Sequence, residues 1–283
     1  NGVLIDQGTL PLSSAVGQLA ADFIESQGNG RPDLGPEEAV NFSFGASIDI
    51  ADMSWTIDFY KIEMENRVAL GANVNFLDAL NFAGGGTDYA TVSEALTELD
   101  ASGIINRSDF IGLDDLSQFR FFSNSFDTTT RGIDIVGNYS FDLWEGITLA
   151  ANYNETEVDD VGTLNPIGDG RVAAIEDLLP NLRGNISWTH TQGTLRTLVR
   201  ANYYGGWDDT GNGVNGIDAA ILIDVEAKYS YSENLDLVIG VNNLFDEYPE
   251  ENPSAGSLGQ LYSEASPFGF NGGMWYVQAR YTY

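Results

Sequence analysis

The residues best suited to chemistry are the oxygen donors of one short segment, Asp208-Asp-Thr-Gly-Asn-Gly-Val-Asn-Gly-Ile-Asp218. Calcium takes six to eight oxygen ligands, which Asp and Asn side chains supply. The candidate calcium ligands are Asp208, Asp209, Asn212 and Asp218. Their spacing fits no EF-hand loop, because no bidentate Glu stands at the twelfth position. A solvated Gly/Asn turn is the first interpretation of the segment and calcium the second; we predict no other metal or cofactor.

Aromatic residues around this segment form the second candidate site. Tyr203, Tyr204 and Trp207 stand at the end of a predicted strand, and Phe268 and Phe270 lie in a later loop. Such rings stack on sugars and other flat ligands, but they also pack loops and line membrane interfaces. Tyr204 is the leading ligand candidate, because side chains alternate between the two faces of a strand and its position places it on the inward face. The candidate substrate-binding residues are Tyr204, Trp207, Asp208, Asp209, Phe268 and Phe270.

Catalysis finds little support in the sequence. His190, the one histidine, ends a predicted strand and has no Ser or Cys partner pattern. The chain has no cysteine, which excludes disulfides and thiolate metal sites. The glycines at 84–86 follow no strand-to-helix pattern, so a phosphate-binding loop is not indicated. We predict no catalytic residues and no enzyme activity.

Charge and hydropathy narrow the class of protein. The formal net charge is -30 at pH 7, so nucleic acid, which needs a basic surface, is excluded as a partner. No run of about 18 apolar residues predicts a transmembrane helix, and no signal peptide is visible from Asn1. This result does not apply to transmembrane strands, because a strand needs only about 9–11 alternating residues to cross the membrane.

Apolar and polar residues alternate with period two in about nine segments, which predicts an all-β chain. The clearest stretches are 40–50, 55–59, 133–141, 147–154, 182–188, 195–203, 221–231, 235–242 and 275–283. Within 221–231, for example, Ile223 and Val225 alternate with Asp224 and Glu226. One face of each strand is therefore apolar and the other polar. Residues 13–27 and 91–102 instead have helical spacing, so we expect short helices there.

The connections between these strands alternate strictly between short and long. Those at 50–53, 143–146, 191–194 and 232–234 are tight, whereas those at 70–117, 158–180, 205–218 and 246–272 are long. Transmembrane barrels have short periplasmic turns and long extracellular loops. Because the short turns share an end with Tyr283, we expect a periplasmic C-terminus and an outer-membrane location in a Gram-negative bacterium.

The last strand ends the chain on an aromatic residue. Its alternating apolar members are Trp275, Val277, Ala279, Tyr281 and Tyr283. An apolar face of this kind meets lipid, and its aromatic residues lie at the interface. This ending resembles the C-terminal assembly signal of outer-membrane β-barrels, which implies the barrel-assembly machinery as a partner.

The odd strand number predicts a segment of a larger barrel. Bacterial single-chain barrels have even strand numbers, since closing an odd set would pair two parallel strands. We expect residues 1–38 to be an extracellular loop region, residues 39–283 to be the C-terminal barrel strands, and the missing strands to precede Asn1.

Several motifs resemble TonB-dependent outer-membrane receptors. They are Ile239-Gly-Val-Asn-Asn-Leu-Phe-Asp-Glu-Tyr-Pro249, Ser266-Pro-Phe-Gly-Phe-Asn-Gly-Gly-Met-Trp-Tyr276, Pro36-Glu-Glu-Ala-Val-Asn-Phe-Ser-Phe-Gly45 and Phe122-Ser-Asn-Ser-Phe-Asp-Thr-Thr-Thr-Arg-Gly-Ile-Asp134. The resemblance implies an antiparallel transmembrane β-barrel of 22 strands, of which this chain supplies about nine. It also implies an N-terminal plug and a TonB motif, neither of which is present in this sequence.

This resemblance implies active uptake of a scarce nutrient such as a siderophore, cobalamin or saccharide. The implied partners are outer-membrane lipid, lipopolysaccharide and, through the plug, the TonB complex. Two other interpretations remain: a passive porin-like barrel and a soluble acidic β-sandwich that binds carbohydrate. Acidic loops repel anionic cargo, which favours neutral, cationic or calcium-bound cargo.

Overall fold

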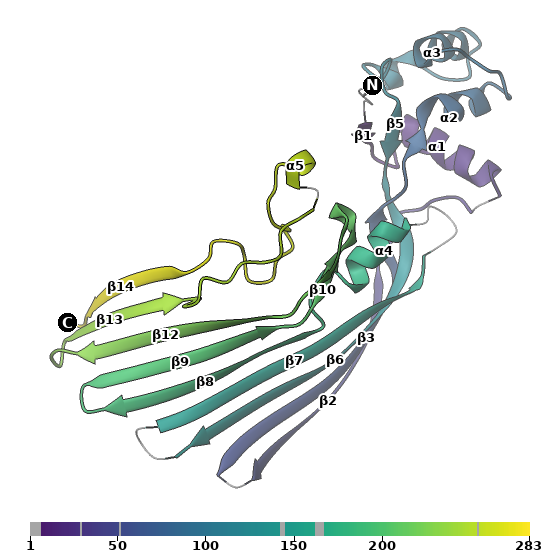
Figure 1. Cartoon of the computed structure of the whole chain (residues 1–283). Helices are drawn as coiled ribbons and strands as arrows, with labels where there is room; N and C mark the ends of the chain where they lie inside the picture. Colours follow the sequence, from purple (N-terminus) through teal and green to yellow (C-terminus); the bar gives the residue numbers. More distant parts are fainter. Residues whose placement is uncertain (1–6, 29, 51, 142–144, 162–166, 254) are drawn as a thin grey trace. The chain divides into compact units, whose positions relative to one another are not determined.

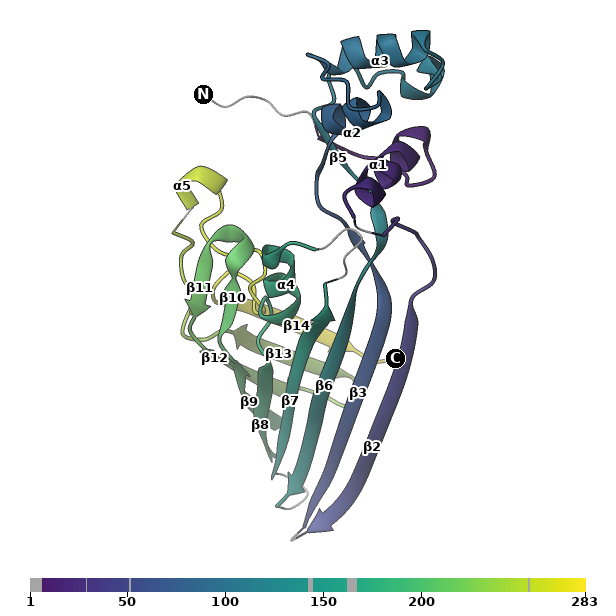
Figure 2. The same ribbon diagram turned by 90° about the vertical axis from the view of Figure 1, so that its right-hand side faces the viewer.

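The computed structural model describes residues 7–28, 30–50, 52–141, 145–161, 167–253 and 255–283, and nine of its strands form one sheet (Figure 1). Their spatial order is β14-β13-β12-β9-β8-β7-β6-β3-β2, and the register-matched pairs are antiparallel. The strands are β2 (Glu38–Ile50), β3 (Met53–Leu70), β6 (Phe122–Ser140), β7 (Glu145–Asp160), β8 (Leu182–Gln192), β9 (Leu195–Tyr204), β12 (Ala220–Ser230), β13 (Leu235–Asn242) and β14 (Met274–Tyr281). The predicted antiparallel barrel segment of about nine strands is therefore confirmed, and the sheet is open between β14 and β2 (Figure 2).

The register divides the sheet into an apolar and a polar face. On one face Ile223 lies opposite Ala201, and Ile239 lies opposite Val277. On the other face Arg200 lies opposite Asp224. The apolar face is uncovered: Val277 is 81% exposed and Trp275 is 72% exposed. No second sheet packs on this face in the part of the chain that the structure describes, so the β-sandwich interpretation is not supported.

Large rings on the polar face lie over glycines of the neighbouring strands. A Cβ at Gly240 would lie 2.3 Å from the ring carbon Cζ of Tyr276, so only glycine fits beneath that ring. The Tyr276 hydroxyl then donates a hydrogen bond of 2.7 Å to Glu226, one strand further along the sheet. Tyr60 covers Gly132 in the same way. These ring-on-glycine contacts hold neighbouring strands in one register.

The chain divides into two compact units, one of residues 1–40, 63–129 and 158–172, the other of residues 41–62, 130–157 and 173–283. The first unit contains a helical cluster with a core of its own. Its elements are α1 (Ala15–Ser26), α2 (Phe76–Ala83), α3 (Val92–Ala101), η1 (Arg107–Phe110) and a small sheet of β1 (Gln7–Thr9), β4 (Val74–Asn75) and β5 (Gln118–Arg120). The rings of Phe76, Phe110 and Phe119 pack together at its centre, with Phe76 and Phe119 fully buried.

Each helix of this cluster begins at a polar side chain that caps its first turn. Ser14 accepts from the backbone N–H of Gly17 at 3.1 Å, and Thr91 accepts from that of Glu94 at 3.2 Å. The predicted helices at 13–27 and 91–102 are confirmed as α1 and α3. The sequence did not predict α2, which has only eight residues, or the short α4 (Asp169–Glu176) and α5 (Ala255–Leu258).

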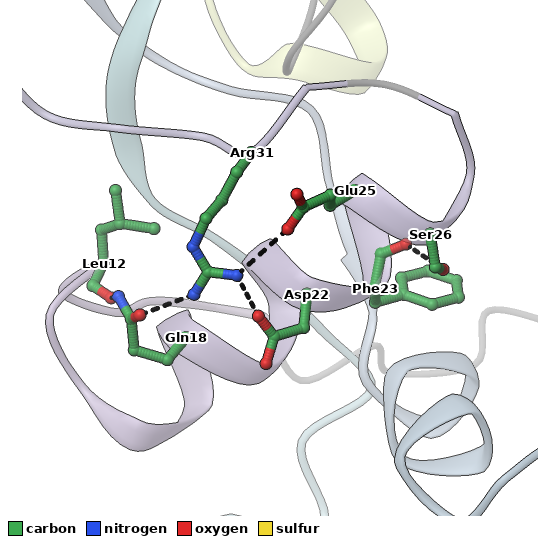
Figure 3. Close-up of polar contacts among 7 residues, drawn as sticks. All are labelled: Leu12, Gln18, Asp22, Phe23, Glu25, Ser26 and Arg31. Atoms are coloured by element: carbon green, nitrogen blue, oxygen red, sulfur yellow. Dashed lines mark hydrogen bonds and ion pairs between the residues drawn. The ribbon is translucent and has the colours of Figure 1, made fainter.

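Arg31 secures the segment that follows α1 (Figure 3). Its guanidinium donates to the Gln18 side chain at 2.7 Å and forms ion pairs with Asp22 and Glu25. The Gln18 amide in turn donates to the Leu12 carbonyl at 2.8 Å. These contacts hold the segment that follows α1 against one side of that helix. Residues 1–38 were expected to be a loop region; within them the structure places β1, α1 and the first residue of β2.

Among the described residues, no helix is both long and apolar enough to cross a membrane. Aromatic residues near both ends of the strands, among them Tyr153, Trp188 and Trp207, predict a girdle at each membrane interface. Tyr153 and Trp188 are 40% and 36% exposed on the apolar face. Trp207 departs from this prediction, because it is 4% exposed and buried in a loop core. Trp144 lies outside the described residues.

Candidate functional site

The aromatic candidates gather where β9 ends. Tyr204 is the last residue of β9, and after two glycines Trp207 begins β10 (Trp207–Asp209), which pairs with β11 (Val214–Ile217). The Phe268 ring lies 5.3 Å from the Tyr204 ring and 6.1 Å from the Trp207 ring, edge to face with the latter. Three of the predicted substrate-binding residues are therefore brought together, two from adjoining strand ends and one from a loop that is distant in sequence.

Phe270 belongs to a second aromatic group. Its ring stacks on Tyr262 at 6.4 Å, and Tyr262 stacks on Tyr248 at 5.7 Å. Phe270 remains 49% exposed, so it has a free surface for a ligand. Tyr248 and Tyr262 were not among the candidates, because nothing in the sequence pairs two loop tyrosines 14 positions apart.

The two candidate carboxylates Asp208 and Asp209 have different partners. The Asp208 carboxylate accepts from the backbone N–H of Gly216, across the β10–β11 hairpin. Asp209 is 3% exposed and accepts from the Ser263 hydroxyl at 2.5 Å. Adjacent residues of a strand point to opposite faces, which explains why the two carboxylates diverge.

These partners limit the calcium interpretation. Within the described ranges, no group of three or more acidic or histidine side chains is arranged to hold a metal ion. The N–H of Asp218 donates to Glu250 at 3.4 Å. The side chain of Asn212 lies outside the described residues. Calcium at this segment stays a prediction.

A cavity of about 420 Å³ opens beside the β10–β11 hairpin. Its lining residues include Asp177, Asn181, Trp207, Asp208 and Asp218. Burial, followed by the charge of Asp208, raises the pKa of Asp177 above its usual value. Carboxylates and an amide at one cavity suit a cationic or hydroxyl-rich ligand. The sequence did not point to Asp177 and Asn181, because they reach the cavity only when the loop before β8 folds back onto the hairpin.

The apolar residues of the last strand lie where the alternation predicts. Trp275, Val277, Ala279 and Tyr281 pair with the apolar face of β13. Tyr283 follows the strand, with its ring 5.4 Å from that of Tyr281. The five predicted signal residues therefore form one exposed apolar edge, and their role in assembly stays a prediction.

Comparisons with known proteins agree with this architecture. A family model described as "TonB dependent receptor-like, beta-barrel" matches residues 12–244. Among curated proteins, none matches. The fold is similar to that of several solved structures. The match to the copper transporter OprC has 11% sequence identity and a TM-score of 0.56, and it covers 89% of this chain and 32% of that one. A mutant of the ferric enterobactin receptor PfeA from Pseudomonas aeruginosa gives 13% identity and a TM-score of 0.57, over 88% and 31%.

The FrpB iron transporter from Neisseria meningitidis gives 11% identity and a TM-score of 0.55, over 87% of this chain and 31% of that one. The chain thus spans about a third of the length of these receptors. At such low identities the likeness shows the fold alone. The family match, which covers most of the chain, carries the assignment, and this family consists of outer-membrane transporters rather than enzymes. The chain belongs to the TonB-dependent receptor β-barrel family.

Proposed function

We propose that this chain forms the C-terminal wall of an outer-membrane receptor that takes up a scarce nutrient with energy from TonB. The observation that carries the proposal is the two-faced sheet of nine strands, in a chain that matches the family over residues 12–244. An apolar outer face suits lipid, and a polar inner face suits a hydrated interior. In this arrangement the short turns and the C-terminus are periplasmic, and the long loops are extracellular.

The aromatic and acidic loop residues are the proposed cargo contacts. Tyr204, Phe268 and Trp207 form one group, and Asp177, Asp208 and Asp218 are lining residues of the adjacent cavity. We propose a neutral or cationic cargo of the siderophore, cobalamin or saccharide type, because these carboxylates repel anions. The names of two similar structures, a copper transporter and a ferric enterobactin receptor, put metal-bearing cargo among the classes to test.

Uptake by cells that carry the whole receptor tests this proposal. Cells would be given radiolabelled ferric siderophores, cobalamin and oligosaccharides, with and without a functional TonB. We expect one class to accumulate only when TonB is present, and Tyr204→Ala, at a ring that is half-buried beside Phe268, to lower its binding. Accumulation that is equal in both strains would show a passive porin instead. TonB is required through the plug, a part of the receptor outside this chain.

A further inference from the structure

The apolar face of the sheet carries a polar cluster at the short-turn end of β7 and β8. Glu145 is the first residue of β7, and it lies directly opposite His190, which stands near the end of β8. Ile147 and Trp188 are the next register pair on the same face, so the side chains of Glu145 and His190 lie among apolar neighbours. Apart from tyrosines, His190 is the one titratable side chain on this face of the described strands β8, β9, β12, β13 and β14. We refer to Glu145, Trp188 and His190 as the Glu–Trp–His triad.

Contacts among its three side chains hold this triad together. The indole N–H of Trp188 donates a hydrogen bond of 2.8 Å to Glu145 Oε1. The His190 ring stacks on the Trp188 ring, with centroids 5.7 Å apart and planes 9° apart. His190 Nδ1 lies 4.0 Å from the same carboxylate oxygen, which is too far for a hydrogen bond, and it is buried without a partner. The indole therefore fixes a carboxylate and an imidazole side by side.

Two groups of the triad are left for a ligand. Glu145 Oε2 has no hydrogen-bond partner among the described residues, and Nε2 is the nitrogen of His190 that remains once Nδ1 is covered. Both side chains are partly exposed. A carboxylate left without partners in an apolar medium is costly, and lipid tails supply no donor. The site therefore favours a molecule that brings a hydrogen-bonding cation to Glu145 and an acceptor to His190.

The surroundings of the triad indicate that this molecule is a lipid. On the same face Ile186, Leu195 and Tyr229 are between 42% and 46% exposed, which leaves apolar surface for acyl chains. A phospholipid headgroup with a primary ammonium carries its cation and its phosphate on either side of a two-carbon linker, as neighbouring Glu145 and His190 require. An anionic headgroup without an ammonium is repelled by Glu145. A quaternary ammonium has no N–H to donate.

We propose that the Glu–Trp–His triad binds the headgroup of a phospholipid with a primary ammonium, of the phosphatidylethanolamine class. The ammonium donates to Glu145, the Nε2–H of His190 donates to the phosphate, and Trp188 holds the carboxylate in place. The proposal rests on the proposed function, since it needs the apolar face to lie in a membrane. The triad selects headgroup chemistry at one position on the wall, whereas aromatic residues elsewhere on this face suit any interface.

Native mass spectrometry of the whole receptor, purified in detergent and given defined phospholipids, tests this site. The wild type should retain phosphatidylethanolamine several-fold better than phosphatidylglycerol or phosphatidylcholine with the same acyl chains. Glu145→Gln should abolish that preference because it removes the charge. His190→Phe, which keeps a ring beside Trp188, should weaken it. Tyr229→Phe, which removes a hydroxyl from the same face, is the matched control and should keep the preference.

Free phosphoethanolamine separates a lipid from a soluble compound with the same chemistry. We expect it to displace the lipid only in large excess, because it has no acyl chains. Displacement at equal concentration would assign the site to a soluble compound and overturn the proposal. Equal retention of the three lipids, or a preference that survives Glu145→Gln, would also overturn it. With TonB-dependent uptake intact, these results would overturn the lipid site alone. A receptor that does not insert into lipid vesicles would instead refute the proposed function, and the lipid site with it.

Discussion

The sheet and the helical cluster bury apolar side chains in opposite ways. In the helical cluster Phe76, Leu80 and Leu96 are fully buried by neighbouring elements of the chain. On the sheet Val40, Val277 and Trp275 remain 67% to 81% exposed. The first region is stabilised by its own packing in water, whereas the second needs an apolar solvent. The period of the pattern separates the two environments: a period of two marks the strands that expose an apolar face, and helical spacing marks helices that bury theirs.

The largest expected effect tests the self-sufficient core. Phe76→Ala removes a ring that packs against both Phe110 and Phe119, and such a loss costs about 3–5 kcal/mol. We expect the helical cluster to become protease-sensitive. The heat-modifiable band, which a folded barrel gives when the sample is loaded on a gel without boiling, should stay unchanged. Phe82→Ala, at a ring that is 40% exposed, is the milder control. Loss of the band with Phe76→Ala would mean that the two regions do not fold separately.

The second prediction tests the exposed apolar face of the sheet. Val225 lies on the apolar face between Val199 and Val241, and an Arg in lipid at mid-membrane costs about 2–4 kcal/mol. We expect Val225→Arg to lower the urea midpoint of the inserted receptor. Gln278→Arg, the matched change on the exposed polar face, should have little effect. Equal losses in both variants would show that the two faces meet the same solvent.

The nine strands of the main sheet were predictable because a period of two governs much of each, but β3 and β6 are longer than the predicted 55–59 and 133–141, and β10 and β11 lie in a predicted loop. Ile223 and Asp224, for example, are assigned to opposite faces by parity alone, and the register confirms it. The helical cluster was only half predictable. Phe76 and Phe119 meet across more than 40 positions, so no local pattern reveals that α2 packs beside β5. The site shows the same limit: Tyr204 and Trp207 were found locally, but Asp177 reaches the cavity only through loop folding.

A smaller effect is expected at the end of the chain. Tyr283 is fully exposed beyond β14 and contacts Tyr281, so its removal should hardly change the stability of the folded sheet. Deleting Tyr283, or Tyr283→Asp, should instead lower the amount of receptor inserted into the outer membrane. Surface labelling and the heat-modifiable band measure this amount. Thr282→Ser is the control, and normal insertion of the deletion variant would refute the assembly role.

The smallest effect concerns the loop cavity. The raised pKa of Asp177 means that its proton is held more tightly in the folded loop than in the unfolded chain. The protonated form stabilises the loop at low pH, and this contribution is lost as pH rises above about 4, the unfolded value. At pH 7, Asp177→Asn should slow hydrogen exchange of the Asp208 amide, which donates to the Asp177 carbonyl. Glu264→Gln should not, and no difference between the variants at pH 7 would contradict this.

The central claim is that these nine strands form a membrane wall with one lipid face and one hydrated face. Spin labels at Val277 and Gln278, neighbours on β14, test it most directly in the whole receptor in bilayers. Quenching by lipid-soluble oxygen should dominate at position 277, and quenching by a water-soluble nickel complex should dominate at position 278. Equal access of the nickel complex to both positions would contradict the account.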